Sequence, residues 1–238
     1  MTIPLFFHSA DAVGQTVSLD ENNARHVVQV LRMQPGEMIQ LTNGCGVLWT
    51  ARIAETGKKT CLASIERVEK CPGPPGRKSA IAISPVKNVA RFEWFLEKAT
   101  ELGIAEIFPL RCKRTEKEHF RIDRLRQICI SAMLQSRQCR LPLLHQPIAF
   151  NDFLTSSGAH AYHSRWIAHC AGYEKHQLAR ALQPTMADGL LLIGPEGDFT
   201  TEEIFEATNA GFLPVSLGET RLRTETAGVV GATLLCLV

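Results

Sequence analysis

The chain has 238 residues, 45% of them hydrophobic and 21% charged, with a formal net charge of +2 at pH 7. This composition is typical of a globular protein with one large domain or two smaller ones. The longest apolar run, Val229–Val238, is too short to span a membrane, the N-terminus lacks signal-peptide features, and the 8 cysteines show no zinc-ligand spacing. We therefore expect a reduced, cytoplasmic protein without a metal site.

The first 72 residues predict a small β-barrel with one helix. Strand-like runs separated by Asn-Gly and Thr-Gly-Lys turn signals cover 37–43, 46–55 and 59–68. A short helix is expected to begin after Asp20 and to run through Arg25 and His26 to Leu31. Because this region has no evident nucleophile, binding is a better interpretation than catalysis.

A linker follows the predicted barrel. The segment Cys71–Lys78 contains three prolines and two glycines, which continue neither a helix nor a central strand. We place the linker at 73–78, so that the domains are 1–72 and 79–238.

The second domain alternates predicted strands and helices. The strands are expected at 79–84, 105–110, 165–170, 189–194 and 214–218. The helices are expected at 92–102, 122–132, 173–182, from the Thr200-x-x-Glu203 capping box to Gly211, and in the apolar tail. This order predicts an α/β fold with a mostly parallel sheet and helices on both faces. Ligands of such sheets bind at the carboxyl ends of the strands.

Charge is distributed unevenly along the chain. Residues 1–78 carry 9 basic and 7 acidic side chains, residues 79–145 carry 12 and 7, and residues 146–238 carry 5 and 10. The basic middle suggests a polyanionic partner, although random scatter over solvated faces is the favoured explanation of the counts alone. The dense basic run between Arg111 and Arg126 is open to the same two interpretations.

Two predicted strands end in unusual turns. The first, Gly194–Phe199, lacks the lysine of a P-loop and the glycine spacing of a dinucleotide-binding turn. Its acidic residues Glu196 and Asp198 favour a neutral or cationic ligand, such as S-adenosylmethionine, over an anion. The alternative is a tight turn whose acidic residues complement a helix dipole. The second turn follows Gly218 and holds a cluster of threonine, arginine and glutamate side chains.

The helix predicted at 122–137 carries a further polar group. Its apolar stripe, if continued, passes through Gln135 and Ser136, and Arg137 and Arg140 follow directly. Buried polar side chains need partners, and arginines pair with phosphates or anionic base edges. A nucleotide contact and a helix end exposed to solvent are both compatible with this pattern.

Four segments together resemble the RsmE family of ribosomal RNA methyltransferases in the SPOUT superfamily. They are RHVVQVLRMQPG, KATELG, LLIGPEGDFTTEE and LGETRLRTETAG. The resemblance covers almost the whole chain. It implies a PUA-like RNA-binding barrel at the N-terminus and a trefoil-knotted methyltransferase domain after it. It also implies a homodimer that uses S-adenosylmethionine to methylate N3 of one uridine in 16S ribosomal RNA, or in the small ribosomal subunit.

The resemblance also implies a cofactor pocket. Its residues would be His169 with Cys170, Ile193, Gly194, Pro195, Glu196, Gly197, Leu217, Gly218, Leu222, Arg223, Thr224, Thr226 and Ala227. The chain departs from the family pattern in three places. Asp198 stands where glycine is usual, Thr220 where arginine is frequent, and Leu5 where many members have a basic residue.

Methylation at N3 requires removal of a proton, so a group must stabilise the uracil anion or accept the proton. For the anion we expect Arg223 first and Arg137 second. Glu225 is a candidate proton acceptor, and its alternative role is a salt bridge with an arginine. RNA contacts are expected from Arg25, His26, Arg32, Lys87, Arg114, Gln135, Arg137 and Arg140.

Two other functions remain open from sequence. One is a methyltransferase with a different RNA target, such as transfer RNA. The other is a non-catalytic RNA-binding protein on the same folds.

Overall fold

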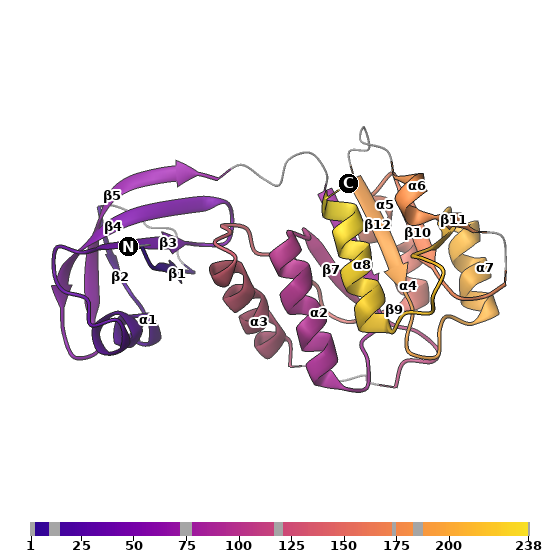
Figure 1. Ribbon diagram of the computed structural model, residues 1–238, viewed down its shortest axis with the longest axis horizontal. Helices are drawn as coiled ribbons and strands as arrows, with labels where there is room; N and C mark the ends of the chain where they lie inside the picture. The colour runs from indigo at the N-terminus through magenta and orange to yellow at the C-terminus, as the bar shows by residue number, and fades with distance from the viewer. Residues whose placement is uncertain are drawn as a thin grey trace. The chain divides into compact units, whose positions relative to one another are not determined.

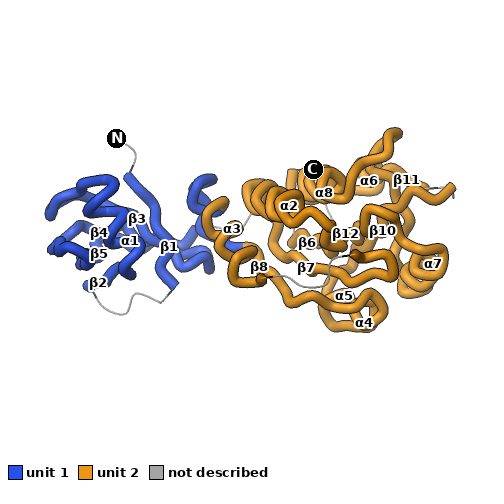
Figure 2. Tube along the Cα trace, turned by 90° about the horizontal axis from the view of Figure 1, so that it is seen from below, with its two compact units in different colours: residues 1–73, 133–141 blue, residues 74–132, 142–238 orange. Residues whose placement is uncertain are grey.

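The computed structural model describes residues 3–9, 15–71, 78–116, 121–172, 175–182 and 188–237. The chain divides into two compact units, residues 1–73 with 133–141 and residues 74–132 with 142–238 (Figure 2). The predicted linker lies outside the described residues except for Lys78, which begins a strand.

Residues 133–141, which the sequence placed in the second domain, group with the first unit. The N–H of Gly46 donates to the carbonyl of Cys139 at 2.7 Å, and that of Leu141 to the carbonyl of Gly44 at 2.8 Å. The segment therefore extends the edge of the barrel by backbone pairing.

The first unit contains a five-stranded sheet in the order β1-β3-β4-β5-β2. Its elements are β1 (Leu5–Phe7), β2 (Thr16–Ser18), α1 (Glu21–Arg25), a π-helical turn (His26–Val30), β3 (Met38–Thr42), β4 (Val47–Thr56) and β5 (Cys61–Lys70). The antiparallel pairs β3–β4 and β4–β5 confirm the predicted hairpins. Asp20 caps α1, because its carboxylate accepts hydrogen bonds from the N–H groups of Asn22 and Asn23.

In the described residues, the second unit contains an eight-stranded sheet in the order β11-β13-β10-β12-β6-β7-β8, with β9 paired to β7. The paired strands are all parallel. Figure 1 labels β7, β9, β10, β11 and β12 of this sheet. Its strands are β6 (Lys78–Ile83), β7 (Glu106–Arg111), β8 (Leu143–Leu144), β9 (Ile148–Ala149), β10 (Arg165–Ala168), β11 (His176–Gln177), β12 (Asp188–Ile193) and β13 (Leu213–Ser216). The helices are α2 (Val89–Leu102), α3 (Ile122–Gln135), α4 (Phe150–Thr155), α5 (Ser157–His160), α6 (Leu178–Ala181), α7 (Thr201–Asn209) and α8 (Thr224–Leu237). The five predicted strands and the parallel sheet are thereby confirmed.

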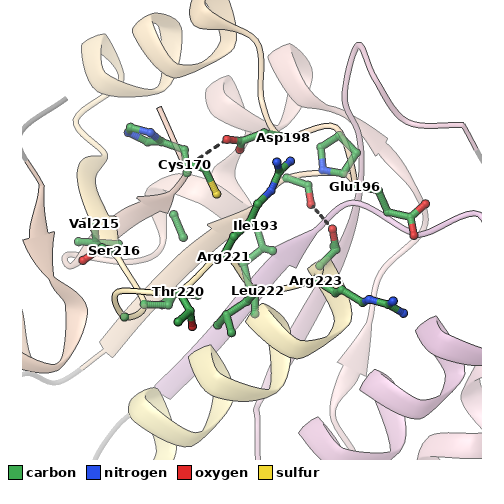
Figure 3. Close-up of a pocket in the computed structure, with 18 of the residues that line it drawn as sticks. Cys170, Ile193, Glu196, Asp198, Val215, Ser216, Thr220, Arg221, Leu222 and Arg223 are labelled. Carbon is green, nitrogen blue, oxygen red and sulfur yellow. Dashed lines mark hydrogen bonds between the residues drawn. The ribbon is translucent and has the colours of Figure 1, made fainter. Parts of the chain in front are cut away.

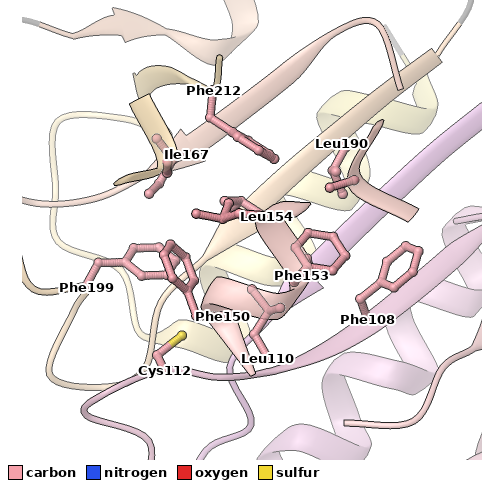
Figure 4. Close-up of a cluster of buried hydrophobic side chains, with 14 of the residues drawn as sticks. Phe108, Leu110, Cys112, Phe150, Phe153, Leu154, Ile167, Leu190, Phe199 and Phe212 are labelled. Atoms are coloured by element: carbon pink, nitrogen blue, oxygen red, sulfur yellow. The ribbon is translucent and has the colours of Figure 1, made fainter. Parts of the chain in front are cut away.

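Alternate residues of the central strands are buried on opposite faces of this sheet. On one face, Leu190 and Leu192 of β12 join a cluster with Phe150 and Phe153 of α4 (Figure 4). The residues between them, such as Leu191, face α8. Both faces of β12 are therefore buried, which explains its continuous apolar sequence.

Helix α8 lies very close to the sheet because two of its residues are glycines. A Cβ atom added at Gly228 would lie 2.5 Å from the ring of Phe95 in α2, and one added at Gly231 would lie 2.5 Å from Leu191. The predicted tail is thus a buried helix packed on α2, β6 and β12. Because β10 lies between β13 and β12 in the sheet, the chain at 217–223 must pass the end of β10 to reach α8, whose Thr224 bonds to the turn after β12.

Two helix ends follow the sequence signals. Gly103 adopts a left-handed conformation (φ 91°) after α2, and Thr200 and Glu203 form the capping box of α7. The prediction of one helix at 173–182 was wrong, because the described part of this segment forms the strand β11 and then the short helix α6. Across the described ranges, every helix is too short or too polar to span a lipid bilayer.

Candidate active site

A cavity of about 830 Å³ opens where the chain leaves the carboxyl ends of β10, β12 and β13 (Figure 3). Because the strands are parallel, these ends lie at the same edge of the sheet. The N-terminal turn of α8 contributes Thr224 and Ala227 to the wall. Most of the predicted cofactor residues lie in its wall, namely His169, Ile193, Gly194, Pro195, Glu196, Leu217, Gly218, Leu222, Arg223, Thr224 and Ala227.

Two predicted cofactor residues lie outside the described wall of the cavity. The carbonyl of Gly197 accepts a hydrogen bond from Arg114 at 2.6 Å, so this glycine faces that arginine. Thr226 is half-buried in the first turn of α8, where Thr224 and Ala227 contribute to the wall instead. The helical rotation of 100° per residue separates these positions.

Residues that the sequence analysis did not select also line the cavity. Val215 and Ser216 end β13, so the strand-end argument could have found them. Lys175 donates to the carbonyls of His169 (2.9 Å) and Ala171 (2.8 Å) and thereby orders the turn after β10. Arg91, from the first turn of α2, carries no local sequence signal.

The wall of the cavity is held by hydrogen bonds between its turns. The hydroxyl of Thr224 donates to the carbonyl of Gly194 at 3.1 Å, which joins α8 to the turn after β12. A Cβ atom added at Gly194 would lie 3.0 Å from the backbone nitrogen of Phe199, so this turn needs glycine for its close backbone approach. Asp198 has a left-handed backbone (φ 64°), and its carboxylate accepts from the N–H of Cys170 at 2.8 Å.

Arg91 lies between two glutamates at the cavity. Its guanidinium is 3.5 Å from a carboxylate oxygen of Glu196 and 3.7 Å from one of Glu225. The Glu225 side chain is 8% exposed, which makes Arg91 its countercharge in a poorly solvated place. This geometry favours the salt-bridge interpretation of Glu225 over a role as proton acceptor.

His169 is buried beside the cavity, and burial together with the nearby charge of Lys175 lowers the pKa of its imidazole. The side chain is therefore neutral at physiological pH. It forms an uncharged part of the wall.

The two arginines expected to stabilise an anion belong to different units. Arg223 is exposed, lines the cavity directly before α8, and extends away from Cys170 in Figure 3. Arg137 groups with the first unit, where its guanidinium donates to the carbonyl of Ile3 (3.3 Å) and to Gln40 (2.9 Å). Its role at the cavity stays a prediction.

The predicted RNA-binding residues of the first unit lie on its surface. Arg25 pairs with Glu21 at 2.7 Å, and His26 packs edge-on against Phe6. Arg32 has a left-handed backbone (φ 54°) and is exposed. The guanidinium of Arg140 donates to the carbonyl of Cys71 at 3.3 Å.

The remaining RNA-binding predictions concern Gln135 and Lys87. Gln135 is exposed at the end of α3, so the predicted buried stripe does not extend to it, and its contact with RNA stays a prediction. Lys87 pairs with Glu116 at 2.9 Å in the second unit. Within the basic run, Arg124 is held by both carboxylate oxygens of Glu93, so part of that positive charge is balanced locally.

Comparisons with known proteins identify the family. Residues 74–236 match an RNA methyltransferase domain, and residues 19–66 match an RNA methyltransferase PUA domain. The crystal structure of a probable rRNA-methyltransferase from Porphyromonas gingivalis is 36% identical, covers 98% of both chains and superposes with a TM-score of 0.89. Ribosomal RNA small subunit methyltransferase E from Neisseria gonorrhoeae, solved with S-adenosyl methionine bound, is 30% identical over 97% of this chain and 95% of its own, with a TM-score of 0.84.

A curated relative agrees with these structures. Ribosomal RNA small subunit methyltransferase E from Rickettsia conorii is 26% identical over 94% of this chain and 91% of its own length. The chain therefore belongs to the RsmE family of RNA methyltransferases, and it combines a PUA-like N-terminal domain with a SPOUT-like methyltransferase domain.

Proposed function

We propose that this protein transfers a methyl group from S-adenosylmethionine to N3 of a uridine in small-subunit ribosomal RNA. The observation that carries the proposal is the cavity at the carboxyl ends of β10, β12 and β13. Its volume of about 830 Å³ falls among those of small-molecule sites. The N. gonorrhoeae relative, which was solved with this donor, supports the choice of ligand.

The residues of the cavity fit an adenosyl ligand with a positive charge. Glu196, Asp198 and Glu219 lie in its wall together with Arg91, Lys175, Arg221 and Arg223. This mixture of charges suits a ligand that carries a sulfonium, an ammonium and a carboxylate. The backbone of the turn after β13 presents peptide groups beside apolar Leu217 and Leu222, which suits a purine ring. When bound, the donor supplies an electrophilic methyl group on its sulfonium.

The side chains at the mouth of the cavity suggest how the acceptor base is activated. N3 of uridine carries a proton at neutral pH, so negative charge develops on the base as that proton leaves. The exposed guanidinium of Arg223 is suited to stabilise this charge, and Arg137 is the second candidate. Arg91 pairs with the carboxylate of Glu225 at 3.7 Å and so links α2 to the first turn of α8.

The experiment is methyl transfer with the purified protein, labelled S-adenosylmethionine, and either naked 16S RNA or small ribosomal subunits. Mass mapping of nuclease fragments should place one methyl group on N3 of a uridine. Arg223→Ala should slow transfer by about 100-fold, whereas Arg180→Ala, outside this cavity, should transfer at the wild-type rate.

Other outcomes distinguish the alternatives. A methyl group found on another atom, or on transfer RNA alone, would show that the protein is a methyltransferase with a different target. Binding of RNA without binding of the donor would favour a non-catalytic protein. The homodimer stays a prediction, which sedimentation equilibrium of the purified protein tests.

A further inference from the structure

We propose that Asp198 is a positioning residue, whose carboxylate joins the turns that follow β10 and β12 and thereby fixes the cavity for the methyl donor. The inference rests on the proposed function and concerns one of the three positions at which the sequence departs from the family pattern. Asp198 has a φ of 64°, which glycine adopts freely and other residues adopt at a cost.

The side chain of Asp198 compensates for this conformation by two hydrogen bonds. One carboxylate oxygen accepts from the N–H of Phe199, the next residue, at 2.8 Å. The other accepts from the N–H of Cys170 at 2.8 Å, across the gap between two turns (Figure 3). Hydrogen bonds to an ionised carboxylate are the stronger kind.

The bond to Cys170 lies where the parallel ladder has ended. Ala168 and Ile193 are the last paired residues of β10 and β12. Beyond them the two turns diverge, and both Cys170 and Asp198 lie in the wall of the cavity. A glycine at position 198 would permit the turn but could not make this connection, so the aspartate adds a constraint that glycine lacks.

The carboxylate has a competing interpretation, in which its negative charge attracts the sulfonium of the donor. Both of its oxygens already accept hydrogen bonds from backbone N–H groups, which offset that charge. Positioning should affect every adenosyl ligand equally, because it acts on the shape of the cavity. Charge attraction should affect the donor and spare its product, which lacks the positive charge on sulfur.

The test compares the affinities of S-adenosylmethionine and S-adenosylhomocysteine by calorimetry. We expect Asp198→Gly to weaken both ligands by the same factor, about tenfold. Asp198→Asn retains one acceptor and tolerates the left-handed backbone, so it should weaken both by a smaller, again equal, factor. Asp152→Asn on α4, outside the cavity wall, is the matched control and should bind as the wild type does.

A second readout needs no cofactor. Amide hydrogen exchange at Cys170 should accelerate by at least about tenfold in Asp198→Gly and not in the control. Unchanged affinity and exchange in Asp198→Gly would overturn the proposal, as would weakening confined to S-adenosylmethionine. If the wild type bound neither ligand, the proposed function would fail, while the exchange measurement would still decide whether Asp198 joins the two turns.

Discussion

The close packing of α8 against the sheet predicts the effect of one added methyl group. Gly228→Ala would place a Cβ atom 2.5 Å and 2.6 Å from two ring carbons of Phe95 and 2.9 Å from Ile83. Both neighbours are fully buried, so neither can move aside without disturbing the core. Such overpacking costs about 1–3 kcal/mol, and the higher helix propensity of alanine returns about 1 kcal/mol. The free energy of unfolding should therefore fall by up to about 2 kcal/mol.

Urea unfolding followed by tryptophan fluorescence measures this change. Trp166 in β10 is 1% exposed and reports on the same unit. Gly172→Ala is the control, because a Cβ atom there meets nothing within 4 Å, and it should unfold as the wild type does. A Gly228→Ala protein more stable than the wild type would refute the reasoning, since helix propensity would then outweigh the close contact.

Three further predictions concern the cavity wall and acid stability. Thr224→Ala should remove the hydrogen bond to the turn after β12 and weaken binding of the methyl donor about fivefold, as calorimetry would show, whereas Thr224→Ser should bind normally. Arg91→Met should leave the buried carboxylate of Glu225 without its countercharge and lower the midpoint of urea unfolding. Arg91→Lys keeps the positive charge, so its midpoint should lie between those of Arg91→Met and the wild type. Equal midpoints for Arg91→Met and the wild type would contradict the pairing. Hydrogen bonding from His145 lowers the pKa of Glu106 to about 2. The free energy of unfolding that the ionised Glu106 contributes is therefore fully present above the ordinary carboxyl pKa and is lost as pH falls toward about 2. Between about pH 5 and pH 3, the Glu106→Gln protein should therefore lose less stability than the wild type.

Local sequence signals predicted the elements whose stability is decided locally. The capping box of α7 and the glycine after α2 mark helix ends by direct backbone contacts. The apolar runs of β6 and β12 reflect burial on both faces, which a sequence displays plainly. The short strands β8 and β9 were missed, because two residues carry no periodicity.

Contacts between distant segments could not be predicted from local sequence patterns. Residues 133–141 join the first unit through backbone pairing with Gly44 and Gly46, which no local pattern announces. The buried stripe extended to Gln135 was wrong, because α3 ends at that residue and leaves it exposed.

The cavity could be predicted in outline because parallel strands bring their carboxyl ends together. Its turns after β12 and β13 were found from their glycines and polar side chains. Arg91 was missed because it reaches the cavity from a helix more than a hundred residues earlier in the chain than the turn at 194–199. The rotation of α8 likewise decides that Thr224 lines the wall and Thr226 does not, within the described residues.

The most direct test of the account is a crystal structure of this protein soaked with S-adenosylmethionine. The account predicts electron density for the donor between the turn at 194–199 and the turn at 217–223. Density for the donor at any other place, with this cavity empty at saturating concentration, would contradict it.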